Sequence, residues 1–240
     1  MATHAPDLEW LPGDVPKAEG FDDTYFSKAG GLLETRHVFL AGNKLPERFQ
    51  GRASFAIAEL GFGTGLNFLT TLAALREVPA APRLLFVSFE LFPMSKDQLT
   101  RALGAFPEID AFAAALANVW KPESGWNRWR VGDAELLLGI GDARQLIGEL
   151  ASPEAGKPEG TVQIPAVDAW FFDGFSPAKN PELWDEELLR KAADLTSDDG
   201  TLATYTAAGW VRRNLQAAGF KVEKVSGFAG KREMVIGRKG

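Results

Sequence analysis

The chain has 240 residues, 45% of them hydrophobic, which is enough for one large domain with a buried core. It has no cysteine and only two histidines, which excludes disulfides and thiolate metal sites and leads us to expect no metal. The net charge of -6 argues against broad nonspecific nucleic-acid binding. No apolar stretch reaches membrane-spanning length and the N-terminus lacks a secretory pattern, so we expect a cytoplasmic protein with no membrane partner.

Residues 1–50 are rich in turn-forming residues and lack a long helical period. The pattern of residues 34–40 is strand-like. We therefore expect residues 1–50 to form an N-terminal extension or lid, and residues 51–240 to form the main domain.

From Ser54 onward, short apolar strands alternate with amphipathic helices, and a hairpin is predicted to turn at Gly132 and Asp133. This alternation is typical of an α/β fold with a mostly parallel, doubly wound sheet. A C-terminal hairpin adds one antiparallel strand. The predicted strands are 54–60, 83–89, 129–140 as the hairpin, 166–172, 201–206, 220–225 and 234–237, and the predicted helices are 66–75, 95–103, 108–119, 143–150, 185–195 and 209–218.

A glycine-rich turn follows the first of these strands. The strand ends at Glu59 and Leu60, and residues 61–65 (GFGTG) precede a helix. A dinucleotide fingerprint needs glycine at the first, third and sixth places, and the sixth place here is Leu66. An acidic residue before glycines in this rhythm resembles motif I of class I (Rossmann-like) methyltransferases. That resemblance implies S-adenosyl-L-methionine as cofactor, bound by Glu59, Gly61, Gly63, Gly65 and Asn67; a tight structural turn is the alternative.

Two further carboxylates complete the expected cofactor site. Glu90 closes the second strand, where a carboxylate can accept both ribose hydroxyls; a solvated strand end is the alternative. Asp133 and Asp142 lie in identical Gly-Asp-Ala triplets and are both candidates for the adenine. Asp142 follows a strand and opens a helix, whereas Asp133 lies in the predicted hairpin turn. Because ligand crevices lie at the carboxyl ends of strands, we choose Asp142 with Ala143.

The strand 166–172 runs into a loop that begins with Asp173. Pro177 and Pro181 predict that this loop is extended and rigid. Phe175 and Trp184 are flat apolar side chains in a polar loop, which either face a flat ligand or pack against the core.

Long motifs in the same order cover nearly the whole chain and resemble the methyltransferase domain of the bacterial MnmC family of tRNA-modifying enzymes. Ser176 stands where many relatives have alanine. The most specific motif is residues 173–181 (DGFSPAKNP), and the others are 21–23 (FDD), 25–27 (YFS), 34–36 (ETR), 59–68 (ELGFGTGLNF), 206–209 (TAAG), 211–213 (VRR) and 231–234 (KREM).

The resemblance implies N-methylation of the 5-aminomethyl group of the wobble (2-thio)uridine in tRNA, giving 5-methylaminomethyl-(2-thio)uridine. Many members also carry an FAD-dependent oxidase domain. This chain ends at Gly240 without a dinucleotide fingerprint, so we expect a stand-alone methyltransferase with no fused FAD oxidase domain.

The resemblance and the chemistry of the reaction together assign roles to individual residues. A protonated amine has no lone pair, so a base is required, and Asp173 is the expected catalytic residue. Phe175 is expected to stack on the uracil. Residues 201–240 carry eight basic and two acidic side chains, which is either a solvated surface or a face for the tRNA anticodon region. The candidate phosphate contacts are Lys179, Arg212, Arg213, Lys231 and Arg232.

Three alternatives remain open. An aminopropyltransferase of the spermidine-synthase kind shares the fold and an acidic amine pocket, but leaves the basic C-terminal stretch unexplained. A methyltransferase for a small amine would act without tRNA. A non-catalytic module would bind S-adenosyl-L-methionine without turning it over.

Overall fold

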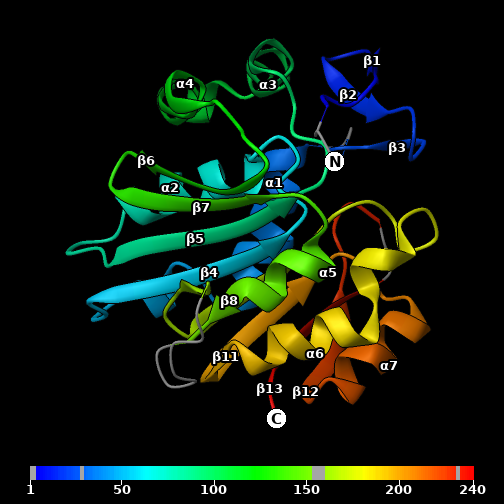
Figure 1. Cartoon of the computed structure of the whole chain (residues 1–240). Coiled ribbons are helices and arrows are strands. Elements are labelled where there is room, and N and C mark those ends of the chain that lie inside the picture. The colour runs from blue at the N-terminus through cyan, green and yellow to red at the C-terminus, as the bar shows by residue number, and fades with distance from the viewer. Residues whose placement is uncertain (1–3, 28–29, 153–159, 231–232) are drawn as a thin grey trace.

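The computed structural model describes residues 4–27, 30–152, 160–230 and 233–240 (Figure 1). Lys231 and Arg232, two of the candidate phosphate contacts, lie outside the described residues. The described chain has an α/β fold around one eight-stranded sheet.

The sheet is mostly parallel, as expected. β4, β5, β7, β10 and β11 run parallel to one another, and β13 is antiparallel to β11, which confirms the C-terminal antiparallel strand. The predicted hairpin is confirmed as β6 and β7, and β6 is a second antiparallel strand at the other edge. From edge to edge the strands are β12 (Phe220–Ser226), β13 (Glu233–Lys239), β11 (Thr196–Thr204), β10 (Val167–Phe172), β4 (Ser54–Leu60), β5 (Arg83–Glu90), β7 (Ala134–Ile140) and β6 (Gly125–Val131).

Helices cover both faces of the sheet, so the doubly wound expectation is confirmed (Figure 1). All six residues of β10 are buried, and all but Asp168 are apolar, as expected of a central strand that is covered on both faces. A small parallel pair, β8 (Leu150–Ala151) and β9 (Val162–Gln163), lies outside the main sheet. One face carries α2 (Leu66–Arg76), α3 (Lys96–Leu103) and α4 (Asp110–Val119), and the other carries α5 (Ala143–Leu146), α6 (Glu186–Asp194) and α7 (Gly209–Ala217).

The order of the strands fixes where a ligand can bind. From β4 the chain proceeds to β5 and β7 on one side, and later to β10 and β11 on the other. The order therefore reverses between β4 and β10. In open α/β sheets, ligands bind in the crevice outside the carboxyl ends of the strands at such a point. The glycine turn follows β4 and Asp173 follows β10, so both motifs meet there.

The N-terminal residues form two different structures. β1 (Leu8–Leu11), β2 (Val15–Ala18) and β3 (Asp23–Thr24) make a small antiparallel sheet beyond the carboxyl ends of the central strands (Figure 1). The strand-like expectation for residues 34–40 is wrong, because α1 (Gly31–Thr35) and the π-helix η1 (Arg36–Leu40) cover them. Val38, Phe39 and Leu40 are buried in the core of the main sheet, and this packing outweighs their β propensity. The domain division at residue 50 stays a prediction.

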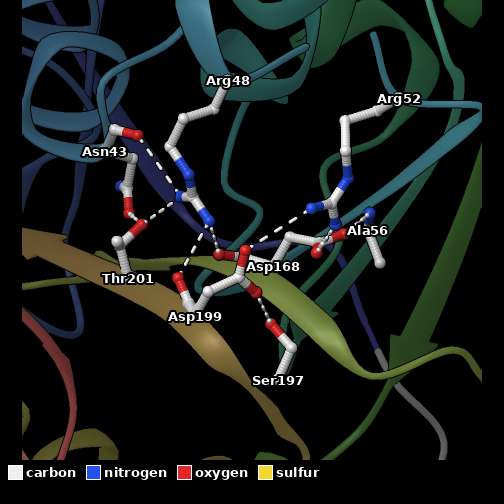
Figure 2. A network of polar contacts seen from close by, with 8 residues as sticks. All are labelled: Asn43, Arg48, Arg52, Ala56, Asp168, Ser197, Asp199 and Thr201. Carbon is white, nitrogen blue, oxygen red and sulfur yellow. Dashed lines mark hydrogen bonds and ion pairs between the residues drawn. The ribbon is translucent and has the colours of Figure 1, made fainter. Parts of the chain in front are cut away.

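A polar network fastens the segment after η1 to the amino ends of the central strands, opposite the crevice. Arg48 donates to the carbonyls of Asp168 and Asp199, each at 3.1 Å. The buried carboxylate of Asp168 pairs with Arg52 and accepts the N–H of Ala56 at 2.8 Å. Burial raises the pKa of Asp168, and the N–H of Ala56 and the guanidinium of Arg52 oppose that rise. Figure 2 shows the network, which comprises Asn43, Arg48, Arg52, Ala56, Asp168, Ser197, Asp199 and Thr201.

We expect Asp168→Ala to lower the free energy of unfolding by about 1–3 kcal/mol, because it leaves the buried N–H of Ala56 without its acceptor and the guanidinium of Arg52 with only the exposed Asp199 as partner. Urea denaturation measures this loss. Asp199→Ala is the matched control, because that side chain is exposed and its pairing contributes about 0–1 kcal/mol. Affinity for a ligand in the crevice should not change in either variant. A fully stable Asp168→Ala protein would show that the network contributes nothing.

Candidate active site

A cavity of about 500 Å³ opens at the carboxyl ends of β4, β5, β7 and β10, a size typical of a small-molecule site. The glycine turn, the loop after Asp173 and the N-terminal residues 21–27 supply its walls. Most of the predicted site residues lie in this lining, which includes Gly61, Gly63, Asn67, Glu90, Asp142, Ala143, Asp173 and Phe175.

The three glycines of the turn all have positive φ, which side chains rarely adopt. A Cβ on Gly61 would lie 2.8 Å from the Cα of Gly174, so the two loops meet backbone to backbone. A Cβ on Gly65 would collide with Phe62 at 2.8 Å. A Cβ on Gly63 would instead point toward Tyr25 in the cavity wall, at 3.1 Å. Gly61 and Gly65 therefore shape the turn, and Gly63 leaves open a part of the cavity that a side chain would occupy.

Glu90 presents an oriented carboxylate to the cavity. Its two oxygens accept the N–H groups of Gly63 at 2.8 Å and Phe92 at 2.9 Å. Burial raises the pKa of Glu90, and these N–H groups oppose the rise. Since Glu90 closes β5 beside the glycine turn, the site has an acceptor where a ribose would need one.

Glu59 lies beneath the cavity and is not among its lining residues. Its side chain is fully buried, and burial raises its pKa well above the ordinary value. The hydroxyl of Ser88 donates to Oε2 at 2.7 Å, and the amide of Asn67 donates to Oε1 at 2.9 Å. Asn67 thus separates Glu59 from the cavity.

The two aspartates of the Gly-Asp-Ala triplets are placed differently. Asp142 lines the cavity and caps α5 by accepting the N–H of Arg144 at 2.9 Å, whereas Asp133 lies in the β6–β7 turn outside the lining. The Arg144 guanidinium lowers the pKa of Asp142 and also pairs with Glu182 at 3.2 Å. Arg144 is a lining residue that the sequence analysis missed, because nothing in the sequence shows that it reaches the loop after β10.

The loop after Asp173 is not extended, so that expectation is wrong. The N–H groups of Lys179 and Asn180 both donate to the carbonyl of Ser176, and the 3₁₀-helix η7 (Pro181–Trp184) follows. The prolines start or flank these turns. Trp184 is fully buried in the core, so packing is its role, while Phe175 lines the cavity.

The N-terminal residues 21–25 pack against this loop and form hydrogen bonds with it. Phe21 stacks on Phe175 at 4.6 Å between ring centroids, and Tyr25 meets Phe175 edge-on at 5.0 Å. The carboxylate of Asp23 accepts the N–H of Ser176 at 2.9 Å, and Lys179 pairs with Asp22. Lys179 is thus held against the N-terminal sheet. Residues 21–23 and 25–27 are among the motifs that carry the family resemblance, but the sequence analysis gave Phe21 and Tyr25 no role.

The charge of the cavity favours cations. Among the described lining residues, Arg144 is the one basic side chain. A sulfonium, an α-ammonium and a protonated amine all suit such a site. The acidic lining residues are Asp23, Glu34, Glu90, Asp142, Asp173 and Glu182.

Arg212 and Arg213 lie on the first turns of α7, outside the cavity lining, and within the described chain neither forms an ion pair.

No group of three or more described His, Asp or Glu residues is arranged to hold a metal. No single described helix is long and apolar enough to cross a membrane; Lys96–Leu103 and Pro107–Val119 meet the length and composition only as a pair, bent by 115°.

Comparisons with known proteins agree with this geometry. The MnmC bifunctional protein of tRNA 5-methylaminomethyl-2-thiouridine biosynthesis from Aeromonas hydrophila is 43% identical and covers 98% of this chain and 36% of its own length. The same protein from Methylobacillus flagellatus is 44% identical, over 96% of this chain and 34% of its own. The chain thus spans about a third of the length of these relatives.

The crystal structure of MNMC2 from Aquifex aeolicus has a TM-score of 0.74, with 24% identity over 98% of this chain and 70% of that chain, and shows the shared fold. A profile of the family described as S-adenosyl-L-methionine-dependent methyltransferase matches residues 107–240. The chain therefore belongs to this family of methyltransferases, and its cofactor is S-adenosyl-L-methionine.

Proposed function

We propose that the enzyme N-methylates the 5-aminomethyl group of the wobble (2-thio)uridine in tRNA, giving 5-methylaminomethyl-(2-thio)uridine. The observation that carries the proposal is Asp173, which faces an acidic cavity at the switch point of a methyltransferase sheet. The names of the relatives at 43–44% identity, which refer to this nucleoside, support it. A tRNA substrate places the enzyme in the cytoplasm.

In this proposal the cofactor is held by the residues that line its side of the cavity. Gly61 and Gly63 line the cavity and let the backbone approach the methionine part, while Gly65 shapes the turn that presents them. Glu90 accepts the ribose hydroxyls, and Asp142 with Ala143 binds the adenine. When bound, S-adenosyl-L-methionine supplies a methyl group on a positively charged sulfur, which is a strong electrophile.

The protein has to supply a neutral amine in the correct place. Asp173 attracts the ammonium and accepts one of its protons, which leaves a lone pair on the nitrogen. With S-adenosyl-L-methionine bound, this lone pair would be free to take the methyl group, and a neutral thioether would be the leaving group. Phe175, held by Phe21 and Tyr25, offers a ring on which the uracil stacks. Alignment of nitrogen, carbon and sulfur accounts for much of the acceleration.

The acidic cavity also suits a small free amine, so the substrate class needs a direct test. Transfer of a labelled methyl group is measured with tRNA, with a free diamine and with both together. We expect the labelled methyl group to appear in tRNA and not in the diamine. Equal transfer to the diamine would favour the small-amine methyltransferase, and transfer of an aminopropyl group from decarboxylated cofactor would favour the aminopropyltransferase.

We expect Arg212→Ala with Arg213→Ala to weaken tRNA binding and to flatten its dependence on salt by about one to two units of logarithmic slope. The reason is that each cation bound to a phosphate releases counterions. Cofactor affinity, measured by calorimetry, should stay at the parent value. Parent tRNA affinity and salt slope in the double variant would show that both arginines are surface charges.

A further inference from the structure

The side chain of Asn67 joins two carboxylates. Asn67 lies in the first turn of α2, and its Nδ2 donates to Asp173 Oδ2 at 2.7 Å and to Glu59 Oε1 at 2.9 Å. Its Oδ1 accepts the hydroxyl of Thr35 at 2.7 Å. Both N–H donors and the carbonyl acceptor are therefore engaged. Asn67, Glu59 and Thr35 are all buried.

The orientation of this amide is fixed by its neighbours. A flipped amide would place its carbonyl oxygen against the side-chain oxygens of Glu59 and Asp173, whereas the hydroxyl of Thr35 could pair with either end of the amide. The observed orientation satisfies all three partners. The two acidic partners therefore favour the observed arrangement, in which an N–H of the amide points at Asp173.

Glu59 is the buried acceptor that fixes the position of the Asn67 amide. It is fully buried at the end of β4, and Ser88 on β5 fixes its other oxygen at 2.7 Å. The contacts run from Ser88 through Glu59 and Asn67 to Asp173 after β10. They cross the switch point, where the cavity opens, and they end on the residue to which the proposed chemistry assigns the proton.

We propose that Asn67 is a positioning residue that holds the Asp173 carboxylate in place to accept the proton of the amine, and that Glu59 acts through Asn67. This inference rests on the proposed function. It gives Glu59 a role different from the direct cofactor contact that the family resemblance implies. Asp173 stands at the start of a loop, where its carboxylate needs an external partner to be oriented. An N–H donor also favours the charged form of a carboxylate, which is the form that accepts a proton.

A double-mutant cycle tests the proposal. Asn67→Ala should lower kcat by about 10- to 100-fold, the scale of a misplaced catalytic group, and shift the acidic limb of the kcat profile to higher pH. In the Asp173→Asn background the same change should cost less than about twofold, because residues that act as a unit are not additive. If Asn67→Ala lowers kcat by the same factor in the parent and in the Asp173→Asn background, the positioning role is overturned.

Thr35→Val provides a milder variant in case Asn67→Ala fails to fold. It removes the hydroxyl that orients the Asn67 amide and should lower kcat by several-fold, with the same shift in pH profile. Thr70→Val is the matched control, because it also removes a buried hydroxyl with one hydrogen bond, to the carbonyl of Leu66, but has no link to Asp173. Equal effects of the two valines would contradict the proposal.

A crystal structure supplies a readout that needs no substrate. In Asn67→Ala, or in Thr35→Val if the former does not fold, the Asp173 carboxylate should leave its parent orientation when S-adenosyl-L-methionine is bound. An unchanged carboxylate would overturn the proposal whatever the acceptor is. A parent enzyme that does not methylate tRNA would refute the proposed function alone, so the two failures are distinguishable.

Discussion

Asp173→Asn is expected to lower the rate of methyl transfer by roughly 100-fold or more while S-adenosyl-L-methionine binds with parent affinity. Asparagine keeps the shape of aspartate and can still accept the N–H of Asn67, so the loop should keep its structure. It cannot carry the negative charge that attracts an ammonium, and it is not a base. Single-turnover kinetics with tRNA, together with calorimetry of the cofactor, separates the two effects.

The pH dependence of this variant provides an internal check. As the pH rises, a growing fraction of the amine is neutral without help from a base, so the variant should gain rate relative to the parent. A purely structural role for Asp173 would produce an unstable variant that alkaline pH does not rescue. A stable Asp173→Asn enzyme with near-parent rate at neutral pH would refute the catalytic assignment.

Gly63→Val is expected to abolish S-adenosyl-L-methionine binding while the fold survives. Its side chain would project toward Tyr25, in the wall of the cavity, where a Cβ already approaches the ring to 3.1 Å. The φ of +55° adds backbone strain, of roughly 1–2 kcal/mol for a non-glycine residue. Calorimetry measures the affinity, and circular dichroism reports whether the protein is folded.

The control for this prediction is Gly132→Val. Gly132 has nearly the same φ, +59°, but it lies in the β6–β7 turn, where a Cβ comes no closer than 3.5 Å to Phe112. The control carries similar strain and leaves the cavity untouched, so it should bind the cofactor normally. Unchanged affinity in a folded Gly63→Val variant would reject the glycine turn as the cofactor site.

Features that depend on neighbouring residues could be predicted from the sequence. A central strand of a doubly wound sheet is buried on both faces, so β10 is apolar at every position except Asp168. The preference for Asp142 over Asp133 required only that one triplet follow a strand and the other occupy a hairpin turn. The positive φ of the glycine turn follows from the glycines themselves.

Features that depend on contacts between distant segments could not be predicted. Val38 and Phe39 have high β propensity, but packing against the sheet makes their segment helical. Asp23 and Ser176 are 153 residues apart, and their hydrogen bond depends on the position of the N-terminal sheet over the cavity. Likewise, motif spacing predicts that Glu59 contacts the ligand but does not show that Asn67 lies between Glu59 and the cavity.

The most direct test of the proposed function is mass spectrometry of wobble nucleosides. The enzyme is incubated with S-adenosyl-L-methionine and tRNA that carries 5-aminomethyl-(2-thio)uridine, with Asp173→Asn as the matched negative. The account predicts that this nucleoside gains one methyl group and becomes 5-methylaminomethyl-(2-thio)uridine with the parent enzyme, and does so far more slowly with the variant. An unmodified wobble nucleoside, in a reaction where the parent binds its cofactor normally, would contradict it.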